Sequence, residues 1–186
     1  MEILNKEDFL KRKKEFLQKI KDGAIFVYPT DTVYGLGCDA MNDDAVRRLR
    51  KIKNAEHPLS VIAPSKKWIS GHCIPSFAQK PLMEKLPGPY TFILKLKKKT
   101  GISPLVNNES ETLGVRIPGH WFSAIVSELG LPLVTTSANI SGKPYMTSVS
   151  DIDPALKKSV DFIIEDGEMH AHPSTLINPD GKRVVR

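Results

Sequence analysis

The chain has 186 residues and a formal net charge of +6, and 40% of its residues are hydrophobic. This is an ordinary composition for a folded protein, and it excludes a collagen-like or broadly disordered chain. The longest apolar runs are short, such as AIFVY at 24–28, whereas a membrane-spanning helix needs about 20 consecutive apolar residues. We therefore expect a single globular domain over residues 1–186 that has no membrane partner.

The excess of basic over acidic residues, 27 against 21, favours polyanionic partners such as nucleotides or RNA. The densest basic cluster, Lys95–Lys99, fits either a solvated strand end or a contact with RNA or phosphate. Two cysteines, Cys38 and Cys73, are too few for a disulfide framework. The N-terminal sequence also lacks the apolar segment of a signal peptide, so we expect a cytoplasmic protein.

Hydrophobic periodicity predicts helices and strands that alternate along the chain. A first helix follows Asn5, which resembles an N-cap, and stops at Gly23. A buried strand at 24–28 and a turn-rich stretch at 29–40 come next, before a helix capped by Asn42 or Asp43. Further strands are predicted at 58–63, 90–98, 112–118, 131–138, 161–165, 174–178 and 183–185, and further helices within 74–86, at 120–129 and near 151–159. The interleaved order predicts an α/β fold in which helices flank one twisted mixed sheet.

Common nucleotide and metal motifs are missing from the sequence: it contains neither GxxxxGK[ST] nor HExxH. The segment from Gly35 to Ala40 matches GxGxxA, but PTDTVY separates it from the preceding strand and no helix follows it directly. The five histidines show no zinc spacing, and His170-Ala-His172 is predicted to be a loop.

Five short polar segments lie at the ends of predicted strands, and they hold the candidate chemistry. They are PTDTVYG at 29–35, PGPYT at 87–91, GVRIP at 114–118, TTSANISG at 135–142 and PSTLI at 173–177. Ligands of open α/β sheets bind where such loops converge. We therefore expect a shared cleft suited to a nucleotide and a small zwitterion, although each segment alone also fits an ordinary turn.

Two of these segments carry the strongest chemical signal. Arg116 inside an apolar strand is costly unless it is paired, and its guanidinium suits a carboxylate or phosphate ligand. An outward-facing Arg on a surface strand is the alternative. The hydroxyls, amide and glycine of 135–142 are typical of an anion-binding turn, and the alternative there is a capped turn into the next element.

The chain contains, in this order, PTDTVYGLGC, a Lys-bearing helix end before PL, PGPYTF, GVRIP, TSANISG, PSTLI and a final VVR. Together these segments resemble the YrdC/TsaC family of L-threonylcarbamoyladenylate synthases. The resemblance runs from about residue 20 to the end of the chain. It implies one α/β domain with a twisted mixed sheet and a basic concave cleft. It also implies synthesis of threonylcarbamoyl-AMP from L-threonine, bicarbonate and ATP, with Mg²⁺ required and pyrophosphate released.

The resemblance further implies that the product serves threonylcarbamoylation of adenosine in ANN-decoding tRNAs. The implied partners are a downstream threonylcarbamoyl-transferase machinery and, as further candidates, tRNA or double-stranded RNA. Carried over by position, the threonine site would comprise Thr32, Arg116, Thr135 and Ser174. The ATP site would comprise Lys53, Thr112, Ser137, Asn139, Tyr145 and Arg186.

Lys53 and Arg116 are the expected catalytic residues, and they would act by positioning and charge neutralisation. No enzyme nucleophile is required, because the carbamate of threonine itself attacks the α-phosphate. Mg²⁺ is expected to be held mainly by the ATP phosphates, so no side chain is assigned to it. The resemblance identifies no general base.

The chain departs from the family pattern K-x-R-x-x-x-K-P-L at one helix end. Here the sequence from Lys53 to Leu59 reads KNAEHPL, which is two residues shorter and lacks the Arg. Lys51 aligns as an alternative to Lys53, and Arg50, Lys51 or His57 are candidates to compensate. This departure keeps a second hypothesis open, a nucleotide- or RNA-binding module like the YciO-like branch that performs no synthesis. A third is a scaffold subunit for a tRNA-modifying partner.

Overall fold

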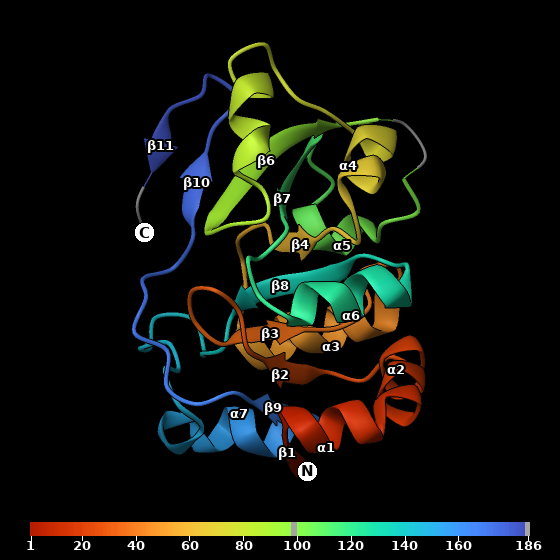
Figure 1. The fold of residues 1–186 in the computed structure, drawn as a ribbon, viewed down its shortest axis with the longest axis vertical. Helices are drawn as coiled ribbons and strands as arrows, with labels where there is room; N and C mark the ends of the chain where they lie inside the picture. The colour runs from red at the N-terminus through yellow and green to blue at the C-terminus, as the bar shows by residue number, and fades with distance from the viewer. Residues whose placement is uncertain (98–99, 185–186) are drawn as a thin grey trace.

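A computed structural model describes residues 1–97 and 100–184, and it confirms the predicted α/β fold. Within these residues eleven strands form one mixed sheet, ordered β1-β9-β2-β3-β8-β4-β7-β6-β10-β11, with β5 paired to β6 (Figure 1). The strands are β1 (Glu2–Asn5), β2 (Phe26–Tyr28), β3 (Gly35–Gly37), β4 (Ser60–Ile62), β5 (Cys73–Ile74), β6 (Tyr90–Leu96), β7 (Thr112–Arg116), β8 (Leu133–Ser137), β9 (Phe162–Glu165), β10 (Thr175–Ile177) and β11 (Arg183–Val184).

Helices and helical turns connect many of these strands. The α-helices are α1 (Lys6–Lys11), α2 (Lys13–Lys21), α3 (Asp43–Lys53), α4 (Lys66–His72), α5 (Pro104–Asn107), α6 (Phe122–Leu129) and α7 (Pro154–Ser159), and the 3₁₀ turns are η1 (Lys80–Lys85) and η2 (Val149–Asp151). None of the helices in residues 1–97 and 100–184 has the length and apolar character needed to cross a bilayer.

Two hydrophobic clusters cover opposite faces of the sheet, as the alternation of side chains along β2 shows. Phe26 and Tyr28 pack into one cluster with aromatic and aliphatic residues of α1, α2 and α6. Val27, between them in sequence, points into the other cluster with the buried face of α3. Because successive side chains of a strand project to opposite faces, helices cover the sheet on both sides.

Several local predictions fail where tertiary pairing decides the structure. The predicted single first helix is wrong, because it breaks at Arg12 into α1 and α2, and β1 precedes it. The turn-rich stretch at 29–40 contains β3, which pairs on both sides with β2 and β8. The predicted helix within 74–86 is only the 3₁₀ turn η1.

Two glycines explain why the hydrophobic periodicity of the sequence does not predict β3. A Cβ at Gly35 would lie 2.7 Å from the Tyr28 ring, and one at Gly37 would lie 2.5 Å from the carbonyl oxygen of Val134. Both positions therefore need glycine because the neighbouring strands approach closely. The GxGxxA match thus reflects packing of the sheet and not a dinucleotide site.

Candidate functional site

All five predicted polar segments meet at one cavity of about 200 Å³ near the middle of the sheet. Its lining consists largely of hydroxyl groups and one guanidinium. The lining residues are Thr30, Thr32, Val33, Tyr34, Gly35, Pro58, Leu59, Ser60, Thr91, Arg116, Thr135, Thr136, Ser137, Pro173 and Ser174. The convergence that the sequence predicts is therefore present.

Arg116 lies at the base of this cavity and is 6% exposed. Its Nη2 donates to Asp31 Oδ1 at 2.5 Å, and the other carboxylate oxygen of Asp31 accepts from the backbone N–H of Gly119 at 2.7 Å. The Arg116 guanidinium also approaches Thr32 Oγ1 at 3.3 Å. Burial lowers the pKa of Arg116, and the negative charge of Asp31 opposes that shift. Nε of Arg116 is buried and has no partner in residues 1–97 and 100–184, so it can donate to a bound anion.

Two hydroxyls of the predicted threonine site are paired with other hydroxyls, one within its own segment and one across the sheet. Thr32 Oγ1 lies 2.9 Å from Thr30 Oγ1, and Ser174 Oγ lies 2.7 Å from Thr91 Oγ1. Thr135 is buried on β8. The structure therefore brings all four predicted threonine-site residues to one cavity, and it adds Thr30 and Thr91 as partners for the hydroxyls of Thr32 and Ser174.

Lys53, the last residue of α3, is 7% exposed and sits behind the turn that follows β8. Its Nζ donates to the carbonyl oxygen of Ser137 at 3.0 Å, to the carbonyl oxygen of Asn139 at 3.1 Å and to Asn139 Oδ1 at 2.7 Å. Ser137 Oγ donates to the same Oδ1 at 2.7 Å. Burial lowers the pKa of Lys53 to about 8. All three ammonium protons are therefore used in holding the turn.

The shortened loop after α3 is closed by Arg50. The guanidinium donates to the carbonyl oxygens of Ala55 at 2.7 Å and of His57 and Leu105, each at 3.2 Å. Lys51 and His57 are exposed. Of the three candidates to compensate for the missing Arg, Arg50 is thus committed to the loop, and Lys51 and His57 remain exposed at the surface.

Of the predicted ATP-site residues that the structure describes, Ser137 lines the cavity, whereas Lys53, Thr112, Asn139 and Tyr145 are not among its lining residues. Thr112 starts β7 and projects to the same face as Arg116, about 13 Å along the strand, where it lines a second, separate cavity. Tyr145 is half-buried and is not in contact with the first cavity. Arg186 lies outside the described residues. Ser137 and Asn139 are the predicted ATP-site residues that the structure brings next to Lys53.

The donor set of the cavity does not form a dedicated Mg²⁺ site. Mg²⁺ in proteins is usually held by one or two carboxylates together with substrate phosphates. Asp31 is the carboxylate beside Arg116, and both of its oxygens are engaged. Within residues 1–97 and 100–184 no group of three or more His, Cys, Asp or Glu is placed to hold a metal.

Sequence reasoning missed residues whose roles depend on long-range contacts. Asp31 was visible as the carboxylate of PTDTVYG, but its pairing with Arg116 spans 85 positions. Thr91 and Ser60 lie in predicted strands, and Tyr34 is the second-last residue of PTDTVYG. Each of the three lines the cavity. The signal for them was their position at strand ends, which did not by itself distinguish them from turn residues.

A family model for Sua5/YciO/YrdC proteins, described as telomere recombination, matches residues 18–186. A protein of Methanocaldococcus jannaschii is 40% identical over 190 residues, which cover 98% of this chain and 87% of that relative. A threonylcarbamoyl-AMP synthase of Idiomarina loihiensis is 34% identical over 175 residues, which cover 90% of this chain and 92% of that enzyme.

Two solved structures resemble the fold closely. The P. abyssi Sua5 structure complexed with L-threonine superposes with a TM-score of 0.83 at 27% identity, covering 95% of this chain and 53% of that longer one. The structure of E. coli YciO superposes with the same TM-score at 28% identity, covering 99% of this chain and 92% of that one.

Proposed function

The chain belongs to the Sua5/YciO/YrdC family, and from this premise we propose that it is a threonylcarbamoyl-AMP synthase. It joins L-threonine, bicarbonate and ATP into threonylcarbamoyl-AMP and releases pyrophosphate. The name of the I. loihiensis enzyme and the L-threonine complex of P. abyssi Sua5 support this activity. The chain spans about half of that Sua5 chain, so functions of the remaining half are not carried over.

The observation that carries the proposal is the cavity at which the five polar segments meet around Arg116. A buried guanidinium with an unpartnered Nε suits the carboxylate of a free amino acid. The hydroxyls of Thr32, Thr135 and Ser174 belong to the same cavity lining and can pair with an amine and a side-chain hydroxyl. A cavity of about 200 Å³ is large enough for a small amino acid such as threonine.

The reaction has two bond-forming steps. The neutral amine of threonine attacks the carbon of bicarbonate, a C–N bond forms, and water leaves after proton transfer. A carbamate oxygen then attacks the α-phosphorus of ATP, an O–P bond forms, and pyrophosphate departs with the bond electrons. The nucleophile therefore belongs to the substrate, and the protein contributes positioning and charge stabilisation.

Each part of the site takes one share of that work. Arg116 holds the threonine carboxylate so that the amine points away from it. The turn from Ser137 to Gly142, held by Lys53, offers hydroxyl and backbone N–H donors to the ATP phosphates. Mg²⁺ held by those phosphates would neutralise charge as pyrophosphate leaves. Thr112, Tyr145 and Arg186 remain proposed contacts to ATP.

A second candidate function is a nucleotide- or RNA-binding module without synthesis. The observation that favours it is the loop after α3, where Arg50 is committed to backbone carbonyls and the family Arg is missing. The similarity to E. coli YciO is in keeping with it. RNA binding with a steep salt dependence, and no pyrophosphate release, would select this function.

We further propose that the product serves a threonylcarbamoyl-transferase acting on tRNA in the cytoplasm. The net charge of +6 and the exposed Lys95 and Lys97 are suited to a tRNA or double-stranded RNA partner. The experiment that tests the activity is an assay of pyrophosphate release from ATP with L-threonine, bicarbonate and Mg²⁺. Omission of bicarbonate and replacement of threonine by serine are the controls.

A further inference from the structure

The connection between β9 and β10 crosses most of the sheet. Six strands lie between β9 and β10 in the sheet order, although the two strands are joined by only the nine residues Asp166–Ser174. We call these residues the strap. Figure 1 shows the strap as an extended trace along one side of the molecule, from β9 beside β1 to β10 beside β6. Its last two residues, Pro173 and Ser174, line the cavity.

The strap has little spare length. Seven spacings of about 4.8 Å separate β9 from β10 along the sheet, which amounts to about 34 Å. The ten residue steps from Glu165 to Thr175 reach at most about 33–36 Å when fully extended. A direct path across a twisted sheet is somewhat shorter than the path along it. The nine residues of the strap therefore leave limited spare length between its two ends, and this restricts where Ser174 can lie.

The first end of the strap is fastened by Tyr34, which itself lines the cavity. The Tyr34 hydroxyl accepts from the backbone N–H of Asp166 at 3.0 Å and donates to the carbonyl oxygen of Gly167 at 2.7 Å. The Asp166 carboxylate adds a second fastening, because Oδ2 accepts from Trp121 Nε1 at 2.5 Å and lies 3.1 Å from His120 Nε2. This end of the strap is therefore held by residues that follow Asp31 and Arg116 in the sequence.

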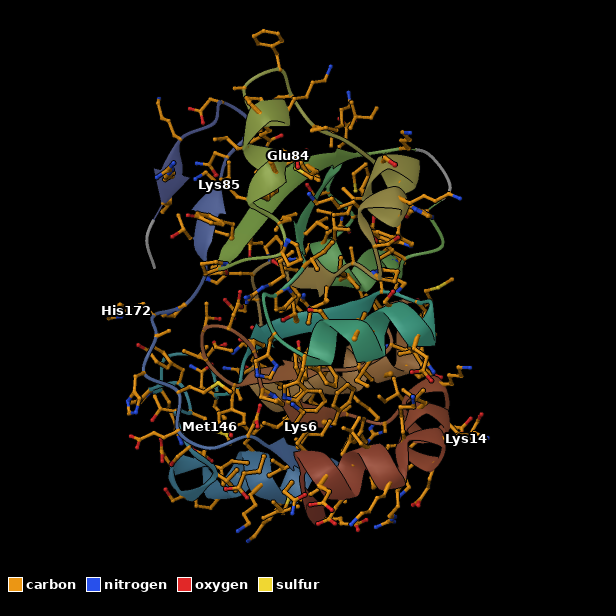
Figure 2. All side chains as sticks on the ribbon, in the orientation of Figure 1. Lys6, Lys14, Glu84, Lys85, Met146 and His172 are labelled. Carbon is orange, nitrogen blue, oxygen red and sulfur yellow. The ribbon has the colours of Figure 1, made fainter. Side chains whose placement is uncertain are left out.

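The second end of the strap is held at β10, and the middle of the strap makes few hydrogen bonds. Thr175 donates from its backbone N–H to the Pro89 carbonyl oxygen at 3.0 Å, and Ser174 Oγ pairs with Thr91. Met169 makes one backbone bond to Thr147 at 2.8 Å. In the part of the chain that the structure describes, no hydrogen bond holds the backbone of residues 170–173. His172 on this stretch projects away from the protein in Figure 2.

We infer that the strap, held at Asp166 and Gly167 by the Tyr34 hydroxyl, sets the position of Ser174 in the cavity, and that Tyr34 is a positioning residue for the amino-acid substrate. The inference rests on the proposed function for the identity of that substrate. Tyr34 acts through the strap, because its hydroxyl accepts one hydrogen bond from Asp166 and donates one to Gly167. Loss of the hydroxyl or added length in the strap has the same consequence: Ser174 keeps its contacts at β10 but is no longer restrained from the other end of the strap.

Two variants test this inference by different routes. Tyr34→Phe keeps the ring and removes the two hydrogen bonds, and we expect KM for L-threonine to rise about tenfold with kcat and KM for ATP changed less than twofold. Insertion of two glycines between His170 and Ala171 leaves Tyr34 intact and adds slack, and we expect the same selective rise. The double substitution His170→Ala with His172→Ala is the matched control, because it alters the exposed strap without changing its length.

Amide hydrogen exchange supplies a readout that needs no substrate. In Tyr34→Phe the Asp166 amide should lose protection, while amides in β6 and β7 keep theirs. Thermal unfolding checks that both variants are folded. Equal losses for threonine and ATP in either variant, or an insertion variant with wild-type KM for threonine, would overturn the inference. If the wild-type protein fails to release pyrophosphate, the proposed function fails, but threonine-binding calorimetry and the exchange measurement still decide the role of the strap.

Discussion

Asp31 and Arg116 form a buried ion pair at the base of the cavity, with 2.5 Å between Oδ1 and Nη2 and side chains that are 11% and 7% exposed. The second carboxylate oxygen of Asp31 accepts a hydrogen bond from the backbone N–H of Gly119, so both oxygens of the carboxylate are held. Arg116 is therefore oriented before substrate arrives. A guanidinium held in this way loses little freedom when it binds a carboxylate, which is how a prearranged site gains affinity.

The ion pair predicts a large stability loss for Asp31→Asn. The substitution keeps the shape of the side chain but leaves the Arg116 charge buried without a counter-ion, so we expect a loss of about 3–5 kcal/mol in the free energy of unfolding. Urea denaturation measures it. The matched control is Asp44→Asn, which removes an ion pair of the same 2.5 Å length that is 64% and 89% exposed, and it should cost less than about 1 kcal/mol. Similar losses in the two variants would show that the buried pair contributes no more than the surface pair.

The division of the site into two halves predicts opposite effects for two alanine variants. Arg116→Ala should raise KM for L-threonine far more than KM for ATP, because it removes the one guanidinium that residues 1–97 and 100–184 contribute to the cavity lining. Ser137→Ala should do the reverse, since Ser137 belongs to the turn proposed to bind phosphate. Each change is expected to be about tenfold or more. Steady-state kinetics with each substrate varied in turn measures both constants, and equal losses of both affinities in each variant would contradict the assignment.

The lowered pKa of Lys53 predicts a pH dependence of ATP use. The ammonium holds the turn through three donated hydrogen bonds, so ATP affinity should fall as the pH rises through about 8. The free energy of unfolding should not fall with this titration of Lys53. The folded-state pKa lies below the usual 10.5, so between these two values the unfolded chain holds more protons and this group makes stability rise with pH.

Lys53→Met distinguishes this titration from that of other groups. The variant should bind ATP at least tenfold more weakly at pH 7 and should lose the fall in affinity near pH 8. Lys51→Met removes an exposed lysine of the same helix end and should have a smaller effect. A larger effect of Lys51→Met would show that Lys51, and not Lys53, supplies the positive charge for phosphate.

Gly114 on β7 lies against Ser60 on β4, and this close approach predicts that a larger side chain at position 114 lowers stability. A Cβ at this position would clash with Ser60 Oγ and would lie 2.9 Å from Ser60 Cβ. Gly114→Ala should therefore cost about 1–3 kcal/mol of stability, as overpacking does. Adding Ser60→Gly should recover most of that loss in thermal or urea unfolding. A double variant no more stable than the single one would show that the clash is not the cause.

Local signals predicted the features of the fold that local chemistry determines. Asn5 and Asn42 cap their helices as expected, because their side-chain oxygens accept from nearby backbone N–H groups. Gly130 ends α6 in the left-handed conformation at φ 76°. These contacts span four positions or fewer in the sequence, so a single sequence contains the whole interaction.

Features that depend on distant segments were not predictable in this way. β1 exists because it pairs with β9, more than 150 positions later, and β3 has a Gly-Leu-Gly sequence with little strand propensity. At the site, the sequence predicted that five polar segments meet, since they lie at strand ends. The pairing of Arg116 with Asp31 and the burial of Lys53 behind Ser137 and Asn139 depend on how those ends are arranged.

Pyrophosphate release from ATP in the presence of L-threonine, bicarbonate and Mg²⁺ tests the proposed activity most directly. We expect release that requires both threonine and bicarbonate, that serine supports poorly, and that yields threonylcarbamoyl-AMP by mass spectrometry. That result would also show that the short loop after α3 supports catalysis without the family Arg. No release from protein that still binds ATP or RNA would contradict the account, and it would favour the binding module.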